Sequence, residues 1–251
     1  MGKFDGKVAI VTGGSRDIGR AVSELLAAEG AKVVVNYHGN EAAAQETLAA
    51  IKQVGGEAII VKGDMTKDAD VKALVDEARK TYGDKIDILV NVVGGMVGRK
   101  KLAEQDEEWY DTVMNVNMKS CYLATLRTVP FMGRGASIVN FSSLAARDGG
   151  GGGASLYATS KGALSVFTRA MAKELGPDGI RVNAVCPGTI ATSFHDRFNT
   201  PENRKRLLGS YALRREGTAE DVANLVVYLA SDEAAYITGA NVDINGGSFF
   251  S

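Results

Sequence analysis

Short apolar, β-branched runs alternate with longer helical patterns from one end of the chain to the other. Most of the runs are continuously apolar, which is typical of parallel strands covered on both faces. The alternation predicts an α/β fold: a Rossmann-like, doubly wound parallel sheet of about seven strands with helices on both faces. The predicted strands lie at residues 8–12, 32–35, 58–61, 86–90, 137–141, 181–185 and 242–244, and the predicted helices at about 17–29, 40–54, 67–82, 103–132, 155–176 and 218–230.

No repeat, linker or low-complexity boundary divides the chain, apart from a run of five glycines at residues 149–153. An α/β chain of 251 residues commonly forms one unit, so we expect a single domain over residues 1–251. Residues 192–212 have the weakest periodicity and carry charges and a proline. We expect this stretch to form a helical lid over a substrate.

The charge balance excludes several classes of partner. With 29 basic and 30 acidic residues, the chain has no strong attraction for nucleic acid or for a membrane surface. Cys121 and Cys186 lie far apart and only two histidines are present, which argues for reduced thiols and against a metal site. No apolar stretch approaches the ~18 residues that a membrane-spanning helix needs. These features predict a cytoplasmic protein that acts on a small molecule and binds no metal.

A glycine-rich turn follows the first predicted strand and opens the first predicted helix. Its glycines let the backbone turn tightly and approach a pyrophosphate, while the helix N-terminus offers free N–H groups and partial positive charge. A glycine cluster that serves only the turn is the plain alternative. As a dinucleotide site, the turn would bind through Gly13, Ser15, Arg16, Asp17, Ile18 and Gly19.

Tyr157 and Lys161 stand four residues apart at the start of a predicted helix, so both side chains point into the same space. A free tyrosine has a pKa near ~10, and lowering it by ~3 units requires about 4 kcal/mol. A lysine ammonium at ~4 Å in an effective dielectric of ~20 provides about that much. Ser143 follows the predicted strand at 137–141, where its hydroxyl would reach a substrate oxygen. The three side chains predict acid–base chemistry on a carbonyl or an alcohol.

These motifs resemble those of the short-chain dehydrogenase/reductase family, in particular chains of about 250 residues similar to 3-oxoacyl reductases. The turn resembles the family's T-G-x-x-x-G-x-G, with Asp17 in place of the middle glycine. We expect the Asp17 carboxylate to turn away from the phosphates and cap the helix. The resemblance implies that Tyr157 transfers a proton, Lys161 lowers its pKa and holds the ribose, Ser143 orients the substrate oxygen, and Asn117 supports a proton relay.

The same resemblance implies further contacts with a nicotinamide cofactor. Asp64 and Met65 follow the third predicted strand, where the family holds the adenine. Asn91 and Gly94 match part of the family's N-N-A-G, with valines between them. After the sixth strand, residues 187–192 match the family's P-G-x-x-x-T, which meets the nicotinamide carboxamide. The residues implied there are Pro187, Gly188, Ile190 and Thr192.

The end of the second predicted strand bears on the choice of cofactor. A carboxylate there would bind the ribose hydroxyls and repel a 2′-phosphate. The chain instead has Asn36, Tyr37 and His38, with no acidic residue before Glu41, and Arg16 lies within reach of a phosphate. This pattern favours NADP(H), and NAD(H) stays open because Asp17 lowers the local positive potential.

Loops at 94–102, 144–156 and 192–212 are expected to form the substrate pocket. Arg99, Arg147 and His195 lie in these loops, so we predict an acidic substrate such as a keto acid or a sugar-derived carbonyl; solvated surface charge is the plain alternative. Two other functions stay open: a 3-oxoacyl thioester reductase, and a nucleotide-binding redox regulator. Because family members commonly pair through their long helices, the resemblance also implies a homo-oligomer, most simply a tetramer.

Overall fold

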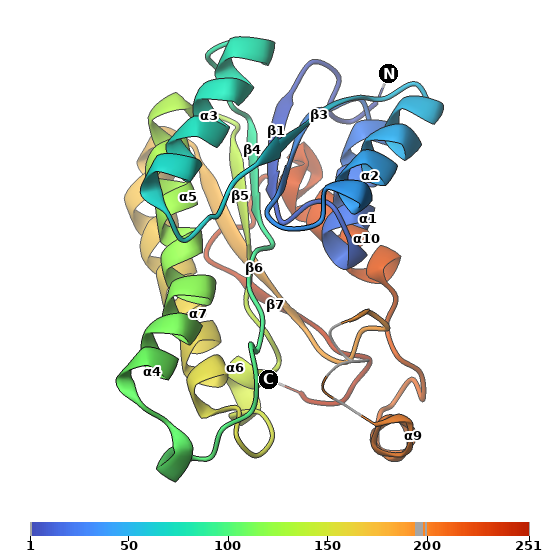
Figure 1. Cartoon of the computed structure of the whole chain (residues 1–251). Helices are drawn as coiled ribbons and strands as arrows, with labels where there is room; N and C mark the ends of the chain where they lie inside the picture. Colours follow the sequence, from blue (N-terminus) through green and yellow to red (C-terminus); the bar gives the residue numbers. More distant parts are fainter. Residues whose placement is uncertain (1, 194–197, 199, 251) are drawn as a thin grey trace.

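The computed structural model describes residues 2–193, 198 and 200–250. One seven-stranded sheet runs through it in the order β3-β2-β1-β4-β5-β6-β7, and every neighbouring pair is parallel (Figure 1). This confirms the doubly wound parallel sheet that the alternation predicts. The strands are β1 (Val8–Thr12), β2 (Lys32–Tyr37), β3 (Glu57–Lys62), β4 (Ile88–Asn91), β5 (Ser137–Phe141), β6 (Arg181–Pro187) and β7 (Asn241–Ile244).

Helices cover both faces of the sheet (Figure 1). One face carries α1 (Asp17–Ala28), α2 (Glu41–Gln53) and α10 (Ala219–Ala230). The other carries α3 (Asp68–Tyr82), α4 (Glu107–Met114), α5 (Ser120–Thr128) and α7 (Ser155–Leu175). Successive side chains of a strand point to opposite faces, so Val11 packs in the core beside α1 and α10 while Ile10 packs in the core beside α3 and α5. Both layers are therefore apolar, which explains the continuously apolar strands.

The predicted helix at 103–132 is wrong as one element. The chain forms a short 3₁₀ turn η1 (Leu102–Glu104), α4, a π-helical turn η2 (Asn115–Lys119), α5 and a second 3₁₀ turn η3 (Val129–Phe131). α4 begins after Asp106, whose carboxylate accepts a hydrogen bond from the backbone N–H of Trp109 at 2.7 Å. The π turn carries Asn117, and single π turns inside helices are frequent at functional sites.

The remaining short elements include α6 (Ala145–Asp148) and α9 (Pro201–Leu208), which lie with the loops at the carboxyl ends of the strands (Figure 1). The turns η4 (Gly176–Asp178) and η5 (Asp232–Ala234) complete the elements that are described. Within the described residues, no helix is both long enough and apolar enough to cross a membrane.

Candidate active site

A cleft of about 1130 Å³ opens at the carboxyl ends of the strands. This is where open parallel sheets bind ligands, because the loops after each strand converge there. The turn after β1 forms one wall, and the segment after β6 faces it. Residues from β5, α7 and the loop after β4 form the inner end of the cleft.

The turn after β1 is built for a close backbone approach. Gly13 adopts φ +64°, and a Cβ on Gly19 would lie 2.1 Å from the carbonyl oxygen of Gly13. No side chain larger than hydrogen fits at position 19 without moving the turn. The tight turn brings the N-terminus of α1 to the cleft, where free N–H groups fit a diphosphate. The residues present therefore fit a dinucleotide.

Asn36, which is among the residues that line the cleft, also holds this turn in place. Its Oδ1 accepts a hydrogen bond from the Gly13 N–H at 3.1 Å, and its Nδ2 donates to the carbonyl of Gly63 at 3.1 Å. The side chain is almost fully buried. Asn36 thus ties the ends of β2 and β3 to the glycine turn, and its expected contact with a cofactor stays a prediction.

The expected helix cap by Asp17 is wrong. α1 begins with Asp17, and its N-cap position, Arg16, makes no side-chain capping hydrogen bond. The Asp17 carboxylate instead accepts hydrogen bonds from Ser193, across the cleft from the glycine turn. The expectation that the carboxylate turns away from the phosphates stays a prediction, and its observed partner is a residue that the sequence did not indicate.

The end of the cleft beside β2 and β3, where the adenosine of a dinucleotide would lie, is lined by Tyr37, His38, Asp64 and Met65 together with Arg16. Burial opposes ionisation of Asp64, but hydrogen bonds from Thr66 and the nearby His38 and Lys67 outweigh it, so its pKa lies below the ordinary value. Asp64 accepts from the backbone N–H of Thr66 at 3.0 Å and from its hydroxyl at 2.7 Å. The carboxylate is therefore ionised and fixed.

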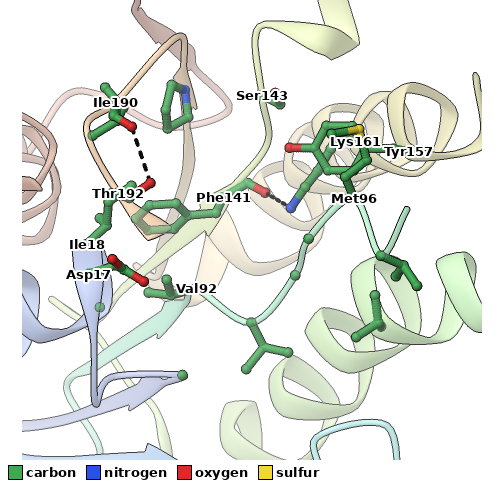
Figure 2. A pocket seen from close by; sticks show the side chains of 18 of the residues that line it. Asp17, Ile18, Val92, Met96, Phe141, Ser143, Tyr157, Lys161, Ile190 and Thr192 are labelled. Carbon is green, nitrogen blue, oxygen red and sulfur yellow. Dashed lines mark hydrogen bonds between the residues drawn. The ribbon is translucent and has the colours of Figure 1, made fainter. Parts of the chain in front are cut away.

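Ser143, Tyr157 and Lys161 all line the inner end of the cleft (Figure 2). Lys161 is buried, its Nζ donates to the carbonyl of Phe141 at 2.8 Å, and it lies 5.9 Å from the centre of the Tyr157 ring. Ser143 stands just beyond β5, and its hydroxyl accepts a hydrogen bond from the Ala145 N–H at 3.1 Å. The structure thus brings the Ser143 side chain, from the loop after β5, together with the Tyr157 and Lys161 side chains of α7.

Burial dominates the titration of the Tyr157–Lys161 pair. It raises the pKa of Tyr157 above its ordinary value, against a smaller lowering by the hydrogen bond with Ser143. It also lowers the pKa of Lys161 to about 8, because the charged ammonium loses solvation. The lowered tyrosine pKa expected from Lys161 alone is therefore not seen. The reason is that both groups are buried and the ammonium is directed to Phe141.

Asn117 lies in the π turn behind this site, fully buried. Its Oδ1 accepts from the Gly95 N–H at 2.9 Å, and its Nδ2 donates to the carbonyls of Gly95 and Val113, each at 2.9 Å. A Cβ on Gly94 would lie 2.7 Å from Lys161 Nζ and 2.8 Å from Asn117 Oδ1. The side chains of Asn117 and Lys161 therefore both reach Gly94, which itself lines the cleft.

Asn91 is not placed at the cleft. It is buried in β4, where its Nδ2 donates to Asn140 at 2.9 Å and to Thr125 at 3.3 Å. These contacts join β4 to β5 and α5 beneath the site. The side chain of Asn91 is therefore not among those that line the cleft, and its expected contact with a cofactor stays a prediction.

The segment after β6 forms the outer wall of the cleft. Pro187, Gly188, Ile190 and Thr192 all line it, and the Thr192 hydroxyl donates to the carbonyl of Ile190 at 3.2 Å (Figure 2). Thr189 pairs with the hydroxyl of Tyr211 at 2.6 Å, which anchors this wall to the residues after α9.

Comparison with known proteins agrees with this geometry. A family model described as "Enoyl-(Acyl carrier protein) reductase" matches residues 13–248. A solved short-chain dehydrogenase from Burkholderia cenocepacia J2315, in complex with NADP, superposes with a TM-score of 0.91 at 35% identity, covering 98% of this chain and 99% of that one. The chain belongs to the short-chain dehydrogenase/reductase family. It is therefore an oxidoreductase of a family that binds a nicotinamide cofactor.

Two curated members of the short-chain dehydrogenase/reductase family show the range of relatives. "Uncharacterized oxidoreductase YgfF" of Escherichia coli (strain K12) is 38% identical over 245 residues, or 96% of this chain and 99% of the relative. The 3-oxoacyl-[acyl-carrier-protein] reductase FabG of Staphylococcus aureus (strain Mu50 / ATCC 700699) is 36% identical over 245 residues, or 97% and 98%. The similarity spans the whole of each relative.

The two described basic residues that were expected to bind substrate, Arg99 and Arg147, differ in their placement. Arg99 lines the cleft and donates to the carbonyl of Gly152 at 3.0 Å, in the glycine run. Arg147 lies outside the cleft lining, because its guanidinium is paired with Asp243 in β7 at 3.2 Å. His195 lies outside the described residues. Of the three, the structure supports a substrate-side position for Arg99 alone.

The loops that sequence reasoning expected at the pocket, 94–102, 144–156 and 192–212, do line the cleft, but their apolar residues were not singled out. These side chains come from the loop after β4, from the residues that flank α6 and from the residues around α9. No periodicity marks loop residues, so the sequence did not indicate which of them face the cleft. The apolar and aromatic lining residues are Met96, Val97, Leu144, Ala154, Phe198, Leu207 and Tyr211.

Proposed function

We propose that this oxidoreductase interconverts a carbonyl and a secondary alcohol with NADP(H), and that Tyr157 is its general acid and base. The observation that carries the proposal is the meeting of Ser143, Tyr157 and Lys161 at the inner end of a cleft whose outer end fits a dinucleotide. When bound, the nicotinamide supplies or accepts the hydride.

In the reduction direction, the Tyr157 hydroxyl donates its proton to the carbonyl oxygen. Its raised pKa keeps the phenol protonated at neutral pH, so the donor is in the required state. Ser143 donates a hydrogen bond to the same oxygen as negative charge develops there. Lys161 stabilises the phenolate that remains and holds a ribose hydroxyl of the cofactor. Most Lys161 side chains are protonated and positively charged at pH 7, because the pKa of Lys161 is about 8.

The preference for NADP(H) is supported by the residues around the adenosine end. Arg16 is largely exposed at the cleft, with 68% of its side chain accessible, and no acidic side chain follows β2 before Glu41. A guanidinium there suits a 2′-phosphate. The Burkholderia relative in complex with NADP supports the same choice. NAD(H) is the alternative.

We propose a keto acid or a sugar-derived carbonyl as the substrate. The apolar lining accepts a carbon skeleton, and Arg99 offers a cation at the glycine run. Asp148 lines the same part of the cleft, so the charge there is mixed. A 3-oxoacyl thioester is the second candidate, favoured by the similarity to FabG. Family membership leaves no support for a redox regulator that lacks turnover.

Three further assignments belong to this proposal: a single domain with a lid at about 192–212, a homotetramer, and a cytoplasmic location. The exposed apolar side chains Tyr122, Leu126 and Val166 on α5 and α7 support helix pairing between subunits. The buried free thiols of Cys121 and Cys186 agree with a reducing compartment.

Tyr157→Phe tests the proposal, with Tyr236→Phe, a fully exposed tyrosine before β7, as its matched control. Loss of the proton donor should reduce kcat by about 10²–10⁴-fold while the Kd for NADPH changes little. The assay follows NADPH and NADH oxidation against keto acids, sugar-derived carbonyls and acetoacetyl thioesters. Carbonyl reduction at wild-type speed by Tyr157→Phe would contradict the assignment.

A further inference from the structure

Asp17, the first residue of α1, adopts a backbone conformation that is uncommon for a residue with a side chain. Its φ is +50°, in the left-handed region that glycine adopts freely and that Asp and Asn tolerate better than other residues. The helix gains no cap from it, since no side-chain capping hydrogen bond is made at the start of α1. The carboxylate must therefore be stabilised by a contact with another part of the chain.

That contact is with Ser193, 176 residues further along the chain. Asp17 Oδ1 accepts from the Ser193 backbone N–H at 3.1 Å, and Oδ2 accepts from the Ser193 hydroxyl at 2.6 Å. Arg16 completes the cluster: its Nη1 donates to the Ser193 hydroxyl at 3.3 Å and lies 3.8 Å from Asp17 Oδ2. Hydrogen bonds to an ionised acceptor are stronger than those between neutral groups.

The contact joins the two walls of the cleft. Asp17 belongs to the turn after β1, where the N-terminus of α1 fits a diphosphate, and Ser193 ends the segment 187–193 after β6. Both residues line the cleft. A dinucleotide lying between the walls would lie beside this contact.

We propose that Asp17 is a positioning residue that latches the segment 187–193 over the bound dinucleotide and so sets the rate at which the cofactor dissociates. The inference rests on the proposed use of this cleft by NADP(H). The hydrogen bonds from Ser193 and the nearby Arg16 also direct the carboxylate's negative charge away from a diphosphate at the helix N-terminus. An otherwise repulsive side chain is thereby accommodated at this position.

The experiment is a double-mutant cycle on the dissociation rate of NADPH, measured by stopped-flow fluorescence with excess NADP⁺ as the competitor. The variants are Ser193→Ala, Asp17→Gly and the double variant. Thr81→Ala is the matched control, because Thr81 carries an exposed hydroxyl on α3 and does not line the cleft. Loss of a charge-assisted hydrogen bond should speed dissociation by about tenfold in each single variant.

The double variant should dissociate no faster than the faster single variant, because both changes remove one contact. The dissociation rate of the control variant and the thermal midpoint of Ser193→Ala should match those of the wild type. A merely structural role of Ser193 would lower that midpoint. A dissociation rate in Ser193→Ala equal to that of the control, or additive effects, would overturn the latch alone. Failure of the wild type to bind either reduced dinucleotide would instead overturn the proposed cofactor and the latch together.

Discussion

Arg147, in the helix that follows the Ser143 loop, is paired with Asp243 in the last strand of the sheet. Its Nε lies 3.2 Å from Asp243 Oδ1, and its Nη2 donates to the carbonyl of Asn241 at 2.8 Å. The two side chains are 22% and 16% exposed. The pair therefore ties the loop that carries Ser143 to the C-terminal edge of the sheet.

Arg147→Ala should destabilise the fold, because it leaves the mostly buried Asp243 carboxylate without its partner. We expect a loss of about 2–4 kcal/mol in the free energy of unfolding, measured by urea denaturation. Arg99→Ala, at the exposed glycine run, should cost far less stability. It should instead raise KM for keto acids more than for neutral ketones, whereas Arg147→Ala should affect both substrate classes equally. If Arg147→Ala raised KM for keto acids more than for neutral ketones, Arg147 would belong to the substrate site after all.

The contrast between Arg99 and Arg147 shows what the sequence can predict here. Both are basic residues in loops after strands, and their spacing alone does not distinguish a cleft residue from one paired with a distant strand. The sheet was predictable because strand and helix periodicities are local. The pairing of Arg147 with Asp243 joins residues 96 positions apart, and no local pattern encodes it.

The same distinction applies to the site. Ser143, Tyr157 and Lys161 were predictable, because each follows a motif placed at a strand end or on a helix face. The structural roles of Asn36 and Asn91 were not, since they depend on which neighbouring strand accepts each amide. The contact of Asp17 with Ser193 was also not predictable, because Ser193 lies in the segment with the weakest periodicity.

Gly94→Ala should disrupt the site without changing any polar side chain. Its Cβ would lie 2.7 Å from Lys161 Nζ and 2.8 Å from Asn117 Oδ1, so one of them must move. A displacement of this kind should reduce kcat/KM by about 10²-fold. Gly95→Ala is the matched control, because nothing lies within 4 Å of a Cβ there. Similar activity of the two variants would show that Lys161 and Asn117 tolerate the shift.

The buried ammonium of Lys161 should make stability depend on pH. Burial lowers its pKa from 10.5 to about 8, so between these values the unfolded chain holds a proton that the folded chain has released. The free energy of unfolding should therefore rise with pH across this window, by up to about 1.4 kcal/mol per pH unit. Burial of Tyr157, which raises its pKa, opposes this only above about pH 10.

The comparison is between the wild type and Lys161→Met, by urea denaturation from pH 7.5 to 9.5. Contributions from other titrating groups cancel in the difference, so the wild type should gain stability relative to the variant as the pH rises. Parallel curves would mean that Lys161 keeps its ordinary pKa in the folded protein.

Arg16→Ala should separate the two cofactors. If Arg16 binds the 2′-phosphate, its removal should raise the Kd for NADPH by about tenfold or more, since a charge-assisted hydrogen bond contributes about 1.5–3 kcal/mol. Arg16 also donates to Ser193, so part of the effect acts on any dinucleotide that the cleft holds. That part should be the same for NADPH and NADH, and the ratio of their Kd values therefore isolates the phosphate contact.

Arg20→Ala is the control, because Arg20 pairs with Glu24 on α1 at 2.7 Å and does not line the cleft. An unchanged ratio in Arg16→Ala, measured by fluorescence titration, would remove the support that Arg16 gives to NADP(H).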